Sequence, residues 1–181
     1  MKKFKIKYLF GILRLILIKF INLNKFNIKG FRYFIGKNVD ININGEGMLS
    51  IDDKVYLSNN CKIECDNANI EIGFNNYFNS YCKIVALDGV KIGDNNIFGP
   101  NVSIYDHNHK YESNDILICK QGFNTSKVNI GSNVWIAANV VITKGVNIGD
   151  RVVVGANSVV TNSLESNGLY AGSPAKLIKK I

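Results

Sequence analysis

The sequence predicts an all-β fold in which short strands and turns wind as the sides of a three-sided prism. From residue 130 the chain reads IGSNVWIAANVVITKGVNIGDRVVVGANSVVT, where Ile or Val recurs at every sixth position. A period of six fits neither a helix nor an alternating strand, whose periods are about 3.6 and 2. Each unit is therefore interpreted as a short strand followed by a turn.

The spacing of earlier apolar residues indicates the number of sides. Three triplets keep the six-residue interval: Ile51, Leu57 and Ile63; Ile72, Phe78 and Ile84; Ile92, Phe98 and Ile104. The intervals between consecutive triplets are nine, eight and, up to Ile130, twenty-six residues. Every insertion thus follows a third strand, which places all insertions at one corner of a three-sided coil.

The inward position of the repeat also explains two of the four cysteines. Cys61 and Cys82 occupy the place taken by valine in later repeats, where a small apolar side chain points inward. Asn76 and Asn96 occupy the same place, so we expect the early coils to be looser. The cysteines show no paired spacing typical of a zinc site and no disulfide framework, which favours a reducing compartment.

The net charge of +8 belongs to the N-terminal segment. Residues 1–39 contain ten Lys or Arg and no acid, which leaves 22 − 10 = 12 bases against 14 acids in the remainder. Because the main body is nearly neutral, a general nucleic-acid-binding surface is disfavoured.

Residues 8–21 form an apolar run, YLFGILRLILIKFI, inside this basic segment. Arg14 and Lys19 interrupt the run, so it is a poor candidate for a membrane span, and no signal-peptide cleavage site follows it. On a helix, Lys3, Lys7, Arg14 and Lys25 would share one stripe. Two interpretations stay open: a helix at a membrane interface with its cations toward anionic headgroups, or a helix packed on the body or on a neighbouring subunit.

Residues 40–181 resemble the hexapeptide-repeat acyltransferases. The most specific stretches are GSNVWIAANVVITKGVNIGDRVVVGANSVVT and AGSPAKLIKK, and the resemblance is nearest to the galactoside, maltose, nodulation-type and polysaccharide O-acetyltransferases. It implies a left-handed parallel β-helix, a homotrimer with active sites between subunits, and acetyl-CoA as acyl donor. The expected organisation is a basic amphipathic segment at 1–39, a β-helix at 40–163 with a loop insertion at 105–127, and a C-terminal segment at 164–181.

The long insertion begins with SIYDHNHKY and holds both histidines, His107 and His109. The resemblance implies that His107 is the catalytic base, and neutral imidazole is suited to taking a proton from a sugar hydroxyl. Asp106 precedes His107, and Asp88 belongs to the previous insertion at the same corner. For His109 three roles stay open: contact with the acceptor, exposure to solvent, or half of a metal pair. A zinc site commonly has three protein ligands, so we expect no metal.

The resemblance implies further contacts, position by position. It places Asn79 at the acceptor and Asp88 close to an acceptor-binding position. It places Trp135 beside the active site, although this ring could also simply cover the prism wall. The contacts to acetyl-CoA that it implies are Ala138, Ala156, Thr161, Lys176 and Lys179; the two lysines could also belong to a solvated tail. Cys119 has no base predicted beside it and is interpreted as a loop residue.

Together these observations predict an acetyl-CoA-dependent O-acetyltransferase that acts on a sugar or a polysaccharide intermediate. Two alternatives stay open: an N-acetyltransferase for an amino sugar or sugar nucleotide, and a non-enzymatic β-helix scaffold. We expect a cytoplasmic protein, with peripheral contact at the inner face of an anionic membrane if the basic segment binds lipid.

Overall fold

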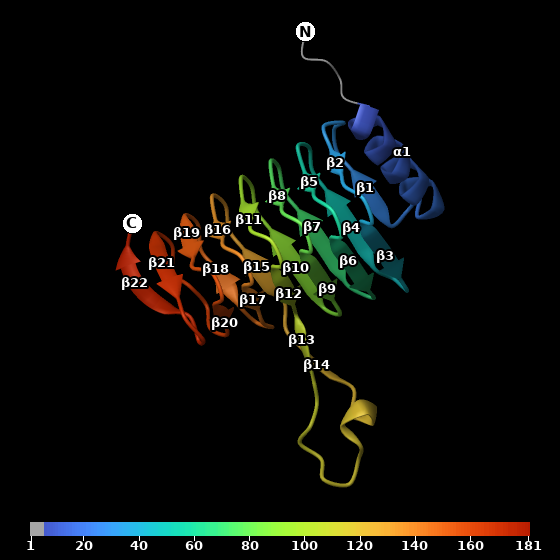
Figure 1. Cartoon of the computed structure of the whole chain (residues 1–181). Helices are drawn as coiled ribbons and strands as arrows, with labels where there is room; N and C mark the ends of the chain where they lie inside the picture. The colour runs from blue at the N-terminus through green and yellow to red at the C-terminus, as the bar shows by residue number, and fades with distance from the viewer. Residues whose placement is uncertain (1–5) are drawn as a thin grey trace.

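The computed structural model describes residues 6–181, with side chains from residue 11 onward. It confirms the all-β fold: short parallel strands wind around one axis as a three-sided β-helix, seen from the side in Figure 1. Six coils each contribute one strand to each of three sheets. We call these sheets A, B and C in the order in which the chain visits them.

Strands of successive coils are neighbours in each sheet. Sheet A contains β1 (Phe26–Ile28), β4 (Met48–Ile51), β7 (Asn69–Ile72), β10 (Gly89–Ile92), β15 (Val128–Ile130) and β18 (Asn147–Ile148). Sheet B contains β2 (Phe34–Ile35), β5 (Tyr56–Leu57), β8 (Tyr77–Phe78), β11 (Ile97–Phe98), β16 (Trp135–Ile136), β19 (Val152–Val154), β21 (Gly168–Ala171) and β22 (Lys176–Lys180). Sheet C contains β3 (Asp40–Asn44), β6 (Lys62–Asp66), β9 (Lys83–Ala86), β12 (Ser103–Tyr105), β17 (Val141–Ile142) and β20 (Val159–Val160).

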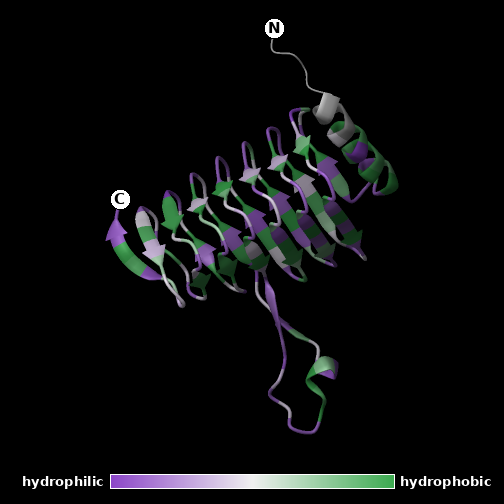
Figure 2. Ribbon diagram, viewed as in Figure 1, coloured by the Kyte–Doolittle hydropathy of each residue, from purple (hydrophilic) through white to green (hydrophobic). Residues whose placement is uncertain are grey.

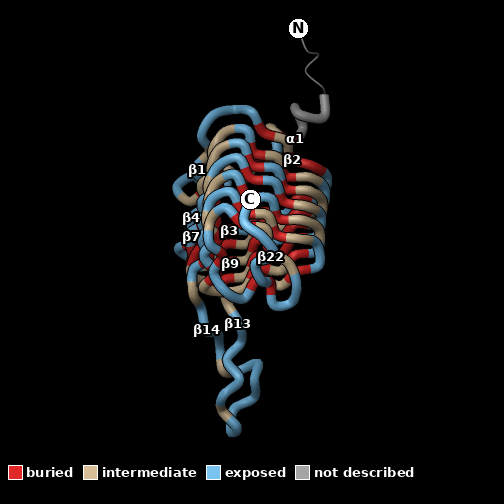
Figure 3. The backbone as a smooth tube through the Cα atoms, turned by 90° about the vertical axis from the view of Figure 1, so that its left-hand side faces the viewer, coloured by how far each residue is buried: buried red, intermediate tan, exposed pale blue. Residues whose placement is uncertain are grey.

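The core is made of columns of apolar side chains that run from coil to coil along the inner face of each sheet. All residues of the predicted triplets are buried, and they stack in register from coil to coil. In sheet B, for example, Phe78 and Phe98 stack with ring centroids 4.4 Å apart. Figure 3 shows the stacked coils, with the exposed residues on their outer sides and turns. Each fully buried Ile, Leu or Phe stabilises the fold by about 1.5–3 kcal/mol.

Asparagine makes the tight corners between the sheets possible. In the described chain, thirteen residues other than glycine have a positive φ, and ten of them are Asn. Asn tolerates this conformation better than most residues. At one corner the side chains also form a ladder, since Asn101 Nδ2 donates to Asn139 Oδ1 at 3.1 Å and Asn139 Nδ2 to Asn157 Oδ1 at 3.0 Å.

The early coils are not loosened by their inward asparagines, contrary to the expectation from sequence. Asn76 and Asn96 are 1% and 0% exposed. The Nδ2 of Asn76 donates to Gly73 O at 2.7 Å and to Gly93 O at 2.8 Å, so it joins two coils. Asn96 repeats this bridge one coil later, from Gly93 O to Gly131 O. Because their polar atoms are satisfied, these residues tie the coils together.

The cysteines behave as predicted at the inward positions. Cys61 and Cys82 are buried, and each thiol lies 3.2 Å from a turn carbonyl oxygen. Cys65 is also buried, and Cys119 is exposed on the insertion. All four are free thiols.

The β-helix begins before residue 40, the predicted boundary. Strands β1 and β2 already form a first coil, with Ile28 and Ile35 in register with Ile51 and Leu57. The difference arises because Ile28 and Ile35 are seven residues apart, so the first coil departs from the six-residue pattern.

Helix α1 (Ile6–Ile21) packs beside β1 and β2 at the N-terminal end of the prism (Figure 1). Of the two interpretations left open for the cation stripe, the described contacts agree with packing on the body. Arg14 Nη2 donates to Val39 O at 2.5 Å, and Lys25 Nζ donates to Gly45 O. Lys3 lies outside the described residues, as does the side chain of Lys7. Among the described helices, none has the length and apolarity needed to span a bilayer.

The predicted insertion leaves the prism as a hairpin. Strands β13 (His107–His109) and β14 (Phe123–Thr125) are antiparallel, and the segment between them includes the 3-10 helix η1 (Ile118–Lys120). Figure 1 shows this insertion projecting far from the stacked coils.

Candidate active site

The insertion starts at the corner where the chain passes from sheet C to sheet A. We call this the C/A corner, and name the A/B and B/C corners in the same way. His107 lies at the root of the insertion, with 16% of its side chain exposed. Its Nδ1 is 3.0 Å from Oδ1 of Asp106.

Asp106 joins the histidine to the preceding coil. Its side chain is fully buried and accepts backbone N–H groups from Leu87 at 2.9 Å and from Asp88 and Gly89 at 2.7 Å. A carboxylate only accepts hydrogen bonds, so the ring proton of His107 lies on Nδ1. In the neutral ring, Nε2 of His107 therefore carries the lone pair that a base needs.

Asp88 lies at the C/A corner, one coil before His107, as the spacing of the insertions predicted. Its backbone N–H and the ring of His107 bond to the same carboxylate. The carboxyl group of Asp88 is half-buried, and no hydrogen bond or ion pair to it is found in the described chain.

An aromatic side chain that sequence analysis did not single out packs against both histidines. Phe123 lies on the second strand of the hairpin, directly across from His109. Its ring is 5.4 Å from that of His107, edge to face, and 4.6 Å from that of His109. The ring of Tyr105, the last residue of β12, lies 6.1 Å from the ring of His107, edge to face. His109 thus forms part of an aromatic cluster, with its own side chain exposed.

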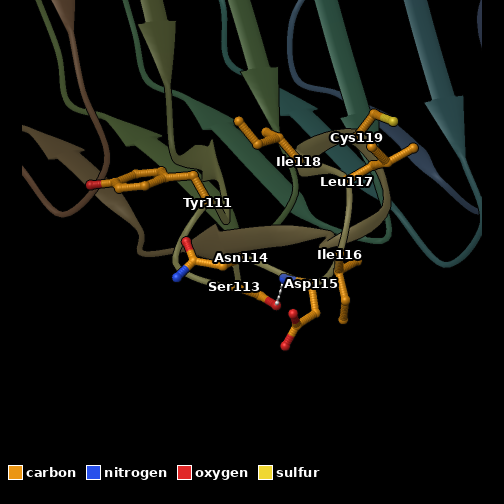
Figure 4. A pocket seen from close by; sticks show the side chains of 8 residues that line it. All are labelled: Tyr111, Ser113, Asn114, Asp115, Ile116, Leu117, Ile118 and Cys119. Atoms are coloured by element: carbon orange, nitrogen blue, oxygen red, sulfur yellow. Dashed lines mark hydrogen bonds between the residues drawn. The ribbon is translucent and has the colours of Figure 1, made fainter.

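The outer half of the insertion folds on itself. The side chain of Gln121 donates to Ser113 O at 3.0 Å and to Ile116 O at 2.7 Å, and it accepts the N–H of Ser113. A hollow of about 580 Å³ results. Figure 4 shows the side chains that line it, which are those of Tyr111 and residues 113–119. Neither histidine lines this hollow.

A second group of predicted residues gathers at the B/C corner. Asn79, Ala138 and Ala156 each lie in a turn that follows a strand of sheet B. The Oδ1 of Asn79 accepts the N–H of Ser80 at 2.8 Å. Within the described chain no protein acceptor binds the N–H of Ala138 or Ala156. These two amides are free to bind a ligand oxygen.

The remaining predicted residues lie on sheet B or at the C-terminal coil. Trp135 points outward from sheet B between Ile97 and Val153 and is 52% exposed. Lys176 and Lys179 lie on the exposed strand β22 at the end of the same sheet. Thr161 follows β20 and therefore lies at the C/A corner, where it is exposed.

One chain does not bring all these residues together. In a three-sided prism the C/A corner is opposite sheet B, so His107 and Trp135 lie on opposite sides of the body. The C/A corner holds His107, His109, Asp88 and Thr161. The B/C corner holds Asn79, Ala138 and Ala156, and sheet B holds Trp135 and the two lysines.

Among residues 6–181, no three His, Cys, Asp or Glu side chains come close enough to form a metal site. His107 and His109 lie on one short strand, and the carboxylate at His107 is already bonded to three backbone amides.

Comparison with known proteins identifies relatives of this arrangement. The family model described as bacterial transferase hexapeptide (six repeats) matches residues 127–162. A putative acetyltransferase of Dictyostelium discoideum is 38% identical over 133 residues, which cover 73% of this chain and 68% of that protein.

Two further similar proteins carry more specific names. The putative lipopolysaccharide biosynthesis O-acetyl transferase WbbJ of Escherichia coli K12 is 40% identical over 109 residues. That match covers 56% of each chain, so it spans little more than half of the relative. The crystal structure of a maltose O-acetyltransferase from Clostridium difficile 630 has a TM-score of 0.60 and 28% identity, covering 96% of this chain and 88% of the other.

Proposed function

This chain belongs to the hexapeptide-repeat acetyltransferases and shares their left-handed parallel β-helix, and we propose that it acetylates a hydroxyl group of a sugar or polysaccharide intermediate. The proposed acyl donor is acetyl-CoA. The names of the similar proteins, a maltose O-acetyltransferase and a putative lipopolysaccharide biosynthesis O-acetyl transferase, support this substrate class.

The observation that carries the proposal is the bond between His107 and buried Asp106. Nε2 of His107 takes the proton of the acceptor hydroxyl while the oxygen of that hydroxyl attacks the thioester carbonyl carbon. The tetrahedral intermediate then breaks its C–S bond, and the imidazolium returns the proton to the departing sulfur. The products are the acetyl ester and CoA thiol, with no acyl-enzyme; a positioned base of this kind contributes about 10²–10⁴-fold.

The donor would lie along the B/C corner. Free N–H groups of Ala138 and Ala156 are suited to bind carbonyl oxygens, and one such amide near the thioester would stabilise the negative charge that develops there. The ammonium groups of Lys176 and Lys179 would attract the phosphates of CoA. Trp135 would cover the donor from sheet B.

Since sheet C separates this corner from His107 in one prism, we propose that the site is completed by a second copy. A closed homotrimer would meet this requirement with the C/A corner of each chain placed against the B/C corner of the next around a threefold axis. The insertion would then form a wall of the acceptor site, and Asn79 and Asp88 would contact the acceptor from two chains.

The four free thiols favour a reducing compartment, and we propose a cytoplasmic enzyme. Peripheral contact with an anionic membrane would bring the site to lipid-linked glycan precursors. The most specific acceptor that we propose is therefore a lipid-linked glycan precursor.

The test is release of CoA thiol from acetyl-CoA across a panel of sugars, oligosaccharides and amino sugars, with products identified by mass spectrometry. We expect an ester, which mild base hydrolyses, and full activity in the presence of a chelator. A base-stable amide formed only on amino sugars would instead assign N-acetylation. Absence of both CoA binding and thiol release would leave the scaffold interpretation.

A further inference from the structure

Helix α1 is held on the first coil by one side only. An added Cβ at Gly11 would meet the backbone nitrogen of Ile35 at 3.0 Å, so helix and strand are in close contact there. Leu15, on the same side, is 3% exposed, and Arg14 donates to the carbonyl oxygen of Val39. These contacts fix which side of the helix faces away from the body.

The side that faces away is apolar. Leu13, Ile16, Leu17, Phe20 and Ile21 follow the spacing i, i+3, i+4, i+7 and i+8, which places them on one helical face. They are between 51% and 72% exposed. Figure 2 shows that the coloured part of α1 is mainly hydrophobic, whereas a surface helix is usually polar on its solvent side. We call these five residues the outer face of α1.

We propose that the outer face of α1 docks the protein on a lipid bilayer, with the helix lying in the plane of the membrane interface. A contiguous apolar patch on a folded protein marks an interaction surface. Sixteen residues make a helix of about 24 Å, too short to cross a bilayer but typical of one that lies along it.

The charge of the N-terminal segment favours lipid over a second copy of the chain as the partner of the outer face of α1. Residues 1–39 carry ten Lys or Arg and no acid. A symmetric contact between two outer faces would bring two such segments together, and like charges in an interface are unfavourable. Anionic headgroups instead complement this segment.

The contacts of the basic side chains indicate whether apolar insertion or attraction to headgroups contributes more to membrane binding. Lys29 and Arg32 pair with Asp52 and Asp53, and Arg14 and Lys25 bond to the first coil. Lys19 and Lys37 are the cations of residues 11–39 whose side chains make no hydrogen bond or ion pair in the described chain. We therefore expect insertion of apolar side chains to contribute more than attraction to headgroups.

The experiment is co-sedimentation of the full-length protein with vesicles of phosphatidylcholine alone and with added phosphatidylglycerol, at low and high salt. We expect binding to both, stronger to the anionic vesicles, with most of it retained at high salt. The double variant Leu17→Ser/Phe20→Ser should lose at least about tenfold in vesicle partitioning. A matched control, Met48→Ser/Ile178→Ser, removes two side chains of 51% and 61% exposure elsewhere and should bind like wild type.

Acetylation of a soluble acceptor and the sedimentation coefficient are measured on the same samples. The proposal expects both to be unchanged in Leu17→Ser/Phe20→Ser, so it stands or falls independently of the reaction. Wild-type protein that ignores both kinds of vesicle would overturn it. So would a double variant that keeps vesicle binding, or one whose oligomer dissociates, since the outer face would then be a contact between protein chains.

Discussion

The chemistry proposed for this chain depends on two adjacent residues with different tasks. His107 is accessible and carries the basic nitrogen, whereas Asp106 is buried and bonded to the preceding turn. Because the carboxylate is anchored by three backbone N–H groups, it holds the imidazole in one orientation without moving itself.

His107→Ala should lower kcat by at least about a hundredfold, because it removes the group that takes the acceptor proton. Binding of CoA should be little changed, since the proposed donor contacts lie at the B/C corner and on sheet B, away from His107 in the same chain. Thiol release and calorimetric titration of CoA measure the two quantities. Turnover near that of wild type would exclude His107 from the mechanism.

Asp106→Asn should lower kcat by at least about tenfold, because an amide cannot accept the same set of N–H groups and leaves His107 free to turn. A thermal melt measures the stability lost from the turn at residues 87–89. To separate positioning from stability, Asp106→Asn is repeated in the His107→Ala background. A positioning role predicts no further loss of turnover there, whereas a purely structural role predicts the same proportional loss in both backgrounds.

At this scale the sequence located the histidine but not its surroundings. The spacing between the apolar triplets correctly placed Asp88 and His107 at one corner. In a strict repeat, the position of a residue in the sequence determines its position in the coil. Phe123 was missed because its neighbours are set by the hairpin register between residues 107 and 125, and the insertion has no repeat from which that register follows.

The first coil is the element that departs most from the repeat, and it depends on specific bonds. Asp53 accepts the backbone N–H and the side-chain Nε of Arg32, at 2.8 Å and 2.6 Å, which joins the first two coils. The hydrogen bond from the Arg32 side chain lowers the pKa of Asp53 from 3.8 to about 2.

The lowered pKa of Asp53 in the folded state predicts how the stability gained from the Arg32–Asp53 contact depends on pH. Its stabilisation is complete above the ordinary pKa near 4 and is lost as the pH falls toward 2. Asp53→Asn should therefore melt below wild type by a constant interval above pH 5, and the interval should shrink between pH 4 and pH 2. Glu46→Gln is the matched control, because the side chain of Glu46 makes no hydrogen bond or ion pair in the described chain. An interval for Asp53→Asn that does not depend on pH would exclude this role for Asp53.

The orientation of α1 could not be predicted from its sequence, because the helix is apolar on two sides. A periodicity argument identifies the stripe of cations but not whether body or solvent lies opposite. The contact that decides it involves Gly11, where a small residue allows the helix to approach Ile35 closely. The inward asparagines were misjudged for a related reason: their partners are carbonyls of the next coil, which only the fold reveals.

At the scale of the whole molecule, the separation of the two corners predicts that inactive chains can complement each other. His107→Ala impairs the C/A corner, and Trp135→Ala impairs the opposite side. When the two variants are refolded together, random assembly leaves about a quarter of the shared sites with both residues intact. Thiol release should then rise toward a quarter of the wild-type rate, while each variant alone stays low.

The control for this experiment mixes the two variants without unfolding them, so that no chains exchange. If refolding together restores no activity, the site belongs to a single chain, and the proposed role of the second copy is wrong. The six-residue period predicted the prism but not this division, because it places residues around one axis and carries no information on a neighbouring axis.

The two ends of the prism differ from its middle in a way that bears on solubility. A solenoid of parallel strands offers unpaired backbone groups at each end, and such edges invite other chains to add on. Here α1 covers part of the first edge, with Arg14 occupying carbonyl oxygens that an incoming strand would seek. At the other end β22 runs antiparallel to β21, in the direction opposite to that of a continuing coil. The molecule therefore carries an element at each end of the described coils that disfavours the addition of further coils from another chain.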